Sequence, residues 1–311
     1  MDRTLKQPAR ALRAALSASA AIVALSASAF GADAKTDFAL VTPQWVAAHC
    51  ADPDVRILDV RPDVQAYLAG HVPNAVHVAD SAFRAPAKGT PVQYLSPAST
   101  ATLLSRCGVR PKDTVVVYSD GANVLGATMV AYVLEKMNHP SVRILDGGWS
   151  AYQKTEKVSQ EYPEVARTRV PARNMRSTHV TLEDVRKLIG KPGVVFIDSR
   201  PEPAYLGQGE TWQRNGHIPG AVNVAWTSVM NADNPHQFRP VDELRGLYAA
   251  KGITPESDII LYCGTSREAS LQYHVMKHLL GFPKVRLYEG SWTEYCSQPE
   301  LKVDTTAVAM R

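Results

Sequence analysis

The chain of 311 residues is long for one hydrophobic core and suits two domains of ordinary size. Hydrophobic residues make up 45% and charged residues 21% of the sequence, which is the balance of a soluble globular protein. The net charge of +4 is small, and no basic cluster with interleaved aromatic residues occurs, which argues against nucleic acid as a partner.

Residues 1–34 have the pattern of a cleaved secretory signal peptide. A basic start precedes the apolar, alanine-rich run Ala14–Ala29, and small-residue cleavage sites end at Ala29 and Ala34. The run is short for a bilayer span, which needs about 20 residues, and no cysteine stands at a cleavage site. We therefore expect export to the periplasm of a Gram-negative bacterium, without a stable membrane anchor.

The remaining chain contains an internal duplication. Four blocks recur in the same order, and the spacing between matching blocks is nearly constant, so two copies of one domain are indicated. The matching blocks are residues 55–62 with 194–201, 70–76 with 216–222, 113–118 with 258–262, and 147–149 with 290–292.

Each copy alternates short apolar runs with helical patterns, which predicts an α/β fold of two tandem domains, each a parallel sheet flanked by helices. The first domain is expected over residues 36–158 and the second over 177–303, with Thr42 and Thr181 capping their opening helices. Residues 159–176 lack apolar periodicity and are predicted to be a linker.

Four cysteines occur, at positions whose spacing matches no zinc-site pattern, so no metal site is expected. They are Cys50, Cys107, Cys263 and Cys296. The sequence leaves open whether Cys50 and Cys107 form a disulfide, because it does not supply the required geometry.

Cys263 stands at the end of the β-branched run 258–262, which is typical of a buried parallel strand. Backbone N–H groups and the dipole of the following helix should converge there, which predicts a lowered thiol pKa and a nucleophilic role. The small residues after the cysteine allow a tightly curled anion cradle. The cradle is predicted to comprise Gly264, Thr265, Ser266, Arg267, Glu268 and Ala269.

Together these motifs resemble the rhodanese superfamily in its tandem form, the thiosulfate and 3-mercaptopyruvate sulfurtransferases. The resemblance rests on Asp-x-Arg after a strand, Gly-His-Ile-Pro-Gly-Ala at 216–221, the strand–cysteine–loop–helix unit and Glu-Gly-Ser-Trp at 289–292. It implies a rhodanese-like fold in both domains and a catalytic second domain. The first copy has Ser119 in place of the cysteine, so that domain is expected to be structural and to close one wall of the cleft.

The implied activity is a sulfurtransferase reaction through a Cys263 persulfide. The thiolate attacks the outer sulfur of a small anionic donor, thiosulfate or 3-mercaptopyruvate, and a thiol, cyanide or sulfite removes that sulfur. A protein thiol or a thioredoxin-like protein would also fit as the acceptor. No metal or organic cofactor is required for this chemistry.

Three arginines are candidates for binding the donor: Arg267, Arg214 and Arg200. Family members tend to hold an arginine where this chain has Ala204, and the loop fits neither donor type, so the donor stays open. Asp198 is expected to support the loop. His217 is expected to order its turn, because attack by a pre-formed thiolate needs no general base.

Two other functions compete with the sulfurtransferase. A phosphatase of the same fold needs Cys-x5-Arg to clamp a phosphate, but the sixth residue after Cys263 is Ala269. An exported sulfur-carrier or sensor module with little turnover remains the alternative, and transfer assays with defined donors would separate it from the enzyme.

Overall fold

The computed structural model describes residues 36–120, 124–235 and 237–307. The predicted signal peptide of residues 1–34 lies outside the described residues. Within the described ranges, no helix is both long enough and apolar enough to cross a membrane.

The first copy forms a five-stranded parallel sheet in the order β1–β7–β6–β2–β3. Its strands are β1 (Asp37–Val41), β2 (Val55–Asp59), β3 (Val76–His77), β6 (Thr114–Tyr118) and β7 (Ser141–Leu145). Its helices are α1 (Pro43–His49), α2 (Val64–Ala69), α3 (Pro97–Arg106), α4 (Leu125–Lys136) and α5 (Gly148–Thr155). A 3-10 turn, η1 (Asp80–Phe83), leads into an antiparallel hairpin of β4 (Arg84–Ala87) and β5 (Thr90–Tyr94).

The second copy forms a five-stranded parallel sheet in the order β10–β9–β11–β12–β8. Its strands are β8 (His179–Val180), β9 (Val194–Asp198), β10 (Val222–Asn223), β11 (Asp258–Tyr262) and β12 (Val285–Tyr288). Its helices are α6 (Leu182–Leu188), α7 (Glu202–Tyr205), α8 (Val241–Ala249), α9 (Arg267–His274) and α10 (Ser291–Tyr295). The 3-10 turns η3 (Arg176–Thr178) and η4 (Trp226–Val229) and the π-helix η5 (Val275–Leu279) complete it.

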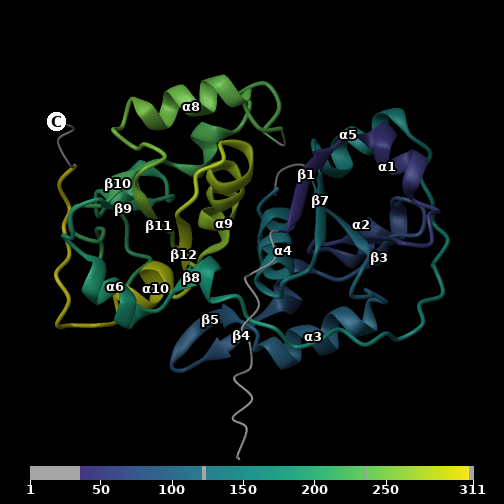
Figure 1. Cartoon of the computed structure of the whole chain (residues 1–311), viewed down its shortest axis with the longest axis horizontal. Helices are drawn as coiled ribbons and strands as arrows, with labels where there is room; N and C mark the ends of the chain where they lie inside the picture. The colour runs from purple at the N-terminus through teal and green to yellow at the C-terminus, as the bar shows by residue number, and fades with distance from the viewer. Residues whose placement is uncertain (1–35, 121–123, 236, 308–311) are drawn as a thin grey trace, which may run out of the picture. The chain divides into compact units, whose positions relative to one another are not determined.

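Read from opposite edges, the two sheets have the same strand order, with β8 in the place of β1 and β11 in the place of β6. The predicted α/β fold of two tandem domains is therefore confirmed (Figure 1). The predicted helix starts also occur: the Thr42 hydroxyl accepts the N–H of Trp45, and Thr181 forms a reciprocal capping box with Asp184.

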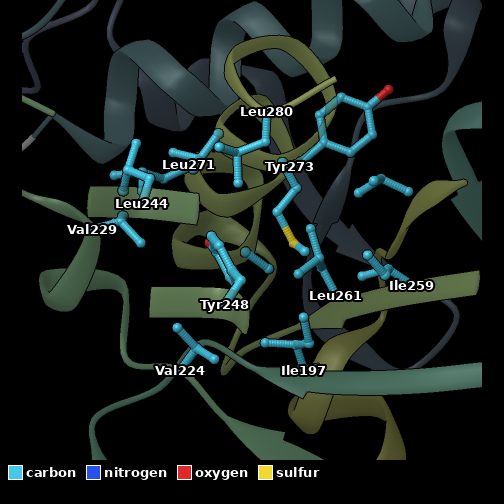
Figure 2. Packing of buried hydrophobic residues seen from close by; sticks show 14 of the residues in the cluster. Ile197, Val224, Val229, Leu244, Tyr248, Ile259, Leu261, Leu271, Tyr273 and Leu280 are labelled. Atoms are coloured by element: carbon cyan, nitrogen blue, oxygen red, sulfur yellow. The ribbon is translucent and has the colours of Figure 1, made fainter. Parts of the chain in front are cut away.

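In the second domain, two clusters of buried side chains enclose β11, one on each face of the sheet. On one face, Ile259 and Leu261 of β11 and Ile197 of β9 pack with Leu271 of α9 and Tyr248 of α8 (Figure 2). Alternate residues of the same strand, which point to the opposite face, enter a second cluster. Because each fully buried apolar side chain stabilises the fold by about 1.5–3 kcal/mol, the end of β11 is a rigid platform.

Candidate active site

Cys263 follows β11 directly, at the carboxyl end of the parallel strands, where α/β proteins commonly bind ligands. Its backbone N–H donates to the Ser291 hydroxyl at 3.3 Å, and its carbonyl accepts the N–H of Trp292 at 2.8 Å. The cysteine has no solvent-exposed surface. The strand end and the start of α10 therefore hold the thiol in one place.

The first copy has the same frame without the sulfur. The Ser119 carbonyl accepts the N–H of Trp149 at 3.0 Å, as the Cys263 carbonyl accepts that of Trp292. Ser119 is buried at the end of β6, the counterpart of β11. A hydroxyl there lacks the polarisable sulfur that could carry a second sulfur atom.

The loop after Cys263 curls round the sulfur. The backbone N–H groups of Thr265 and Ala269 favour the ionised form of the Cys263 thiol and so lower its pKa, whereas the Glu268 side chain raises that pKa. Ser266 makes the curl by adopting a left-handed conformation, with φ of 60°, just before α9 begins. Of the predicted cradle residues, Thr265, Glu268 and Ala269 therefore influence the charge of the Cys263 sulfur, and the cradle itself stays a prediction.

The expected lowering of the thiol pKa is wrong for this structure. Burial raises the pKa of the Cys263 thiol, and the negative charge of Glu268 raises it further. The N–H groups of Ala269 and Thr265 work in the opposite direction but do not offset burial. The sequence reveals the N–H donors, but it does not show that Cys263 is buried away from water.

Asp198 and Arg200 form a buried pair, and Arg200 lines the same cavity as the loop. The Arg200 guanidinium donates to the Asp198 carboxylate at 2.6–3.1 Å and to the Gly216 carbonyl at 2.6 Å, and it lies 4.7 Å from the centre of the Trp292 ring. His217 stacks on Tyr205 and hydrogen-bonds the Tyr205 carbonyl at 2.7 Å, which fits a turn-ordering role.

Arg214 is used differently from its predicted role in donor binding. Its guanidinium donates to backbone carbonyls of four residues that follow α10 or end it, at 2.6–3.2 Å. These carbonyls belong to Tyr295, Cys296, Gln298 and Leu301. Arg214 therefore clamps the C-terminal segment of the domain, and its donors are occupied there.

Two residues of the first domain contact the loop, and the sequence analysis did not predict either of them. Arg84 donates to the Thr265 carbonyl at 2.6 Å, and the Tyr94 hydroxyl donates to the Ser266 carbonyl at 3.3 Å. Both lie on the β4–β5 hairpin, which carries no motif in the sequence. From the preceding turn, Asp80 forms an ion pair with Arg267.

Three arginines surround the loop, and each keeps one buried N–H group without a hydrogen-bond partner among the described residues. These groups are Nε of Arg84, Nη1 of Arg200 and Nε of Arg267. Electrostatic interactions also join Cys263 to Arg84 and Arg200. Unpaired guanidinium N–H groups in a buried setting are suited to an anionic ligand.

A cavity of about 390 Å³ opens beside the loop. Its walls include Arg200, Arg267, Glu268 and Trp212, with Ala204 at the place where the resemblance calls for an arginine. The Trp212 ring packs so closely that a Cβ atom added at Gly264 would lie 2.9 Å from it, which explains the glycine at that position.

The other cysteines are free thiols, so the structure joins neither Cys50 and Cys107 nor any other described pair by a disulfide. Outside the loop, potential ligand atoms of Glu135, His274 and His278 lie within 4.8 Å of one another. The Glu135 carboxylate already accepts from His278 at 2.8 Å and pairs with the Lys277 ammonium at 3.1 Å. A metal ion there would have to displace these partners.

Comparison with known proteins gives consistent matches. A family model described as Rhodanese-like domain matches residues 42–155 and 181–298. A Synechococcus elongatus protein named "Putative thiosulfate sulfurtransferase" is 45% identical over 273 residues, covering 85% of this chain and 84% of the relative. The sulfur carrier protein TtuD of Thermus thermophilus is 35% identical over 279 residues, covering 82% of this chain and 93% of the relative.

The solved structure of wild-type EanB has the same fold, with a TM-score of 0.74 and 23% sequence identity. That match covers 87% of this chain and 69% of the EanB chain.

Proposed function

The chain belongs to the rhodanese family, whose domain model matches both of its halves, and on this premise we propose that it is a sulfurtransferase carrying the moving sulfur on Cys263. One observation carries the proposal. Of two matching frames, only the second holds a cysteine, and that cysteine is ringed by N–H donors and arginines.

In the first half-reaction, the Cys263 thiolate attacks the outer sulfur of a small anionic donor. With thiosulfate, the bond between the two donor sulfurs breaks, and sulfite leaves with the electron pair. The N–H groups of Thr265 and Ala269 stabilise the persulfide anion, and the open N–H groups of Arg200 and Arg267 hold the donor oxygens.

In the second half-reaction, a thiophilic acceptor attacks the outer persulfide sulfur and regenerates Cys263. Cyanide, sulfite or a low-molecular-weight thiol fits the cavity, and a protein thiol could approach its open side. The two steps share one covalent intermediate, so ping-pong kinetics are expected. Thiosulfate is the favoured donor, since several relatives are named for transferring its sulfur.

A sulfur-carrier role is the second candidate, favoured by the 35% identity to the Thermus thermophilus carrier protein. A carrier would also form the Cys263 persulfide, but it would pass the sulfur to a protein and turn over slowly with cyanide. Measuring turnover with small acceptors separates the two functions.

The decisive experiment is intact-mass measurement after exposure to thiosulfate and, separately, to 3-mercaptopyruvate. We expect a gain equal to one sulfur atom with at least one donor, and loss of that adduct in Cys263→Ser. Cys296→Ser is the matched control and should keep the adduct, because among the described residues the one hydrogen bond of its thiol goes to the Thr293 carbonyl. An unchanged adduct in Cys263→Ser would exclude the mechanism.

We further propose that the protein acts in the periplasm after removal of residues 1–34. The support is the basic start, the alanine-rich run and the small-residue cleavage sites. N-terminal sequencing of the exported protein should find a start between Phe30 and Lys35. A membrane-retained chain that begins at Met1 would contradict this.

A further inference from the structure

Glu135 of α4, His274 of α9 and His278 of η5 meet where the two domains contact each other. One potential ligand atom from each of these side chains lies within 4.8 Å of the other two. Glu135 and His274 are buried, and the His278 side chain is 5% exposed. None of the three residues lines the cavity beside the catalytic loop, so this cluster is distinct from the site proposed for the sulfur donor.

His274 supplies the observation that points to a ligand. Its Nε2 is hydrogen-bonded to the Thr128 carbonyl at 2.9 Å. A carbonyl can only accept, so Nε2 carries the ring proton and Nδ1 keeps a lone pair. This Nδ1 is buried and has no hydrogen-bond partner among the described residues. A histidine that donates one ring N–H to a backbone carbonyl and offers its other nitrogen is arranged as metal-binding histidines usually are.

The two imidazole rings are fixed in place by Phe38 of β1. The Phe38 ring stacks on His274 with ring centres 4.7 Å apart and on His278 with ring centres 4.5 Å apart. The two imidazoles lie 5.7 Å from each other and are inclined by 23°. Histidines four residues apart on one helix are a known pair of zinc ligands. His278 lies in the π-helix η5, and such turns are frequent at functional sites.

The two oxygens of the Glu135 carboxylate have different partners. Oε1 accepts from the Tyr273 hydroxyl at 2.8 Å and pairs with the Lys277 ammonium at 3.1 Å, whereas Oε2 accepts from His278 Nε2 at 2.8 Å. A cation bound through Oε2 displaces the His278 proton, so that this nitrogen becomes a ligand itself. The Lys277 side chain is 23% exposed and can turn into solvent once the ion neutralises the carboxylate. Both partners can therefore give way to an ion.

We propose that Glu135, His274 and His278 form a binding site for a divalent cation, Zn²⁺, that joins the two domains. Two imidazoles and one carboxylate, with a fourth position for water, are a usual set of zinc ligands. Ligand atoms about 2.0–2.2 Å from a tetrahedral ion lie about 3.4 Å from one another, so atoms within 4.8 Å need to approach by at most about 1.4 Å. The ion would link α4 of the first domain to α9 and η5 of the second.

The test is zinc binding by the whole chain, freed of metal with a chelator and carrying no purification tag. Equilibrium dialysis followed by metal analysis should find one tightly bound Zn²⁺ per parent chain. Free Zn²⁺ at 100 times its Kd should raise the melting temperature by about 5 °C, because the ion binds the folded chain.

His278→Gln removes one ligand while its amide can still donate to the Glu135 carboxylate. Its zinc affinity should fall by at least about 100-fold, since loss of a partner outside the ligand shell already costs about 10- to 100-fold. His49→Gln is the matched control and should bind zinc like the parent. His49 also stacks on an aromatic ring, that of Trp45, and hydrogen-bonds a backbone carbonyl, but it lies on α1 outside the cluster.

Cobalt distinguishes this site from zinc binding by cysteines. Co²⁺ held by nitrogen and oxygen ligands absorbs in the visible range, whereas a thiolate ligand adds a strong near-ultraviolet band. We expect visible bands alone in the parent, and their loss in His278→Gln. Melting temperatures of the metal-free variants check that they fold. If His278→Gln does not fold, Glu135→Gln is the second variant and should show the same loss of zinc affinity.

Absence of zinc binding in the parent, equal binding in the parent and the ligand variant, or a thiolate band from the bound cobalt would overturn the site. None of these measurements follows sulfur transfer, so such a result would leave the proposed sulfurtransferase function unaffected. Failure of persulfide formation would in turn leave the cation site unaffected.

Discussion

Arg200 and its counterpart Arg61 show why a strong motif need not mark a substrate site. Arg61 donates to Asp59 at 2.5–3.0 Å and to the Gly70 carbonyl at 2.8 Å, which is the same set of partners that Arg200 has in the second domain. Since the first copy has no cysteine, the pair is present for stability. Arg200 also keeps one buried N–H group without a hydrogen-bond partner among the described residues, and it lines the cavity beside the loop.

Arg84 is the residue on which recognition of the donor's charge should depend beyond the second domain. We expect Arg84→Ala to raise the donor's KM by about ten- to a hundredfold, because a hydrogen bond to a charged group contributes about 1.5–3 kcal/mol. Steady-state kinetics with varied donor concentration measure this. The melting temperature should change little, since among the described residues the guanidinium makes one hydrogen bond, to the Thr265 carbonyl.

Arg214→Ala is the matched contrast to Arg84→Ala. It removes hydrogen bonds to four backbone carbonyls around α10, so the melting temperature should fall while the donor's KM stays near that of the parent. If Arg214→Ala raised KM and Arg84→Ala did not, the assignment of the donor's cations would be reversed.

At the scale of elements, the connection between β11 and α9 contains the candidate cradle. Its geometry depends on one strained residue, Ser266. Ser266 has φ of 60°, a left-handed conformation that costs a non-glycine residue free energy. It is nevertheless buried, and its carbonyl is held by the Tyr94 hydroxyl of the first domain. The hairpin of one domain therefore helps to hold the catalytic loop of the other.

Relief of the backbone strain at Ser266 leads to a prediction about stability. Ser266→Gly should raise the free energy of unfolding by up to about 1 kcal/mol, because glycine adopts positive φ without a steric cost. Thermal denaturation measures the change, and persulfide formation should be retained. Ser270→Gly, inside α9 with ordinary helical geometry, should instead destabilise the protein. A loss of stability in Ser266→Gly would mean that its side chain matters more than its backbone.

At the scale of the whole molecule, the two domains share a buried polar network between α4 of the first domain and α9 and η5 of the second. Glu135 of the first domain accepts the Tyr273 hydroxyl at 2.8 Å and pairs with Lys277 and His278. Burial works against its ionised form, but these partners lower the pKa of Glu135 to about 2. The His274 ring donates to the Thr128 carbonyl of the first domain. Burial lowers the pKa of His274 to about 3.

This network predicts loss of stability in acid, with a defined sign. The pKa of His274 is depressed from 6.5 to about 3 on folding, so below pH 6.5 the unfolded chain binds a proton that the folded chain does not. The contribution of neutral His274 to the free energy of unfolding is complete above pH 6.5 and declines as pH falls. The expected loss is about 2 kcal/mol between pH 6.5 and about pH 5, from 1.4 kcal/mol per pH unit. Glu135 acts only lower, from about pH 4.5 downward, because its folded pKa is about 2.

Chemical denaturation at several pH values checks this in the parent and in His274→Leu. The variant should be somewhat less stable at pH 7, where the Thr128 carbonyl loses its donor, but its stability should fall less between pH 6.5 and 5. Other buried histidines with lowered pKa values, His139 and His179, contribute equally to both proteins and cancel in the difference. Identical slopes would contradict the assignment.

The sequence by itself determined the architecture and pointed to the candidate nucleophile. Repeated apolar runs with the same spacing define two sheets of one topology, because strand burial depends on local pattern. The single cysteine at a strand end, matched by Ser119 in the other copy, identifies Cys263 as the residue that differs between them. These features lie within short segments, so they can be recognised without knowledge of long-range contacts.

Only the tertiary structure decided the electrostatics and the partners of the site. The thiol pKa is raised because burial outweighs the N–H donors, and burial depends on all the elements that cover Cys263. The Arg214 guanidinium binds carbonyls of the C-terminal segment. Arg84 contacts the loop, although more than a hundred residues separate the two in the chain. A long, flexible side chain binds whichever carbonyl or carboxylate folding brings within its reach, and sequence spacing does not encode that proximity.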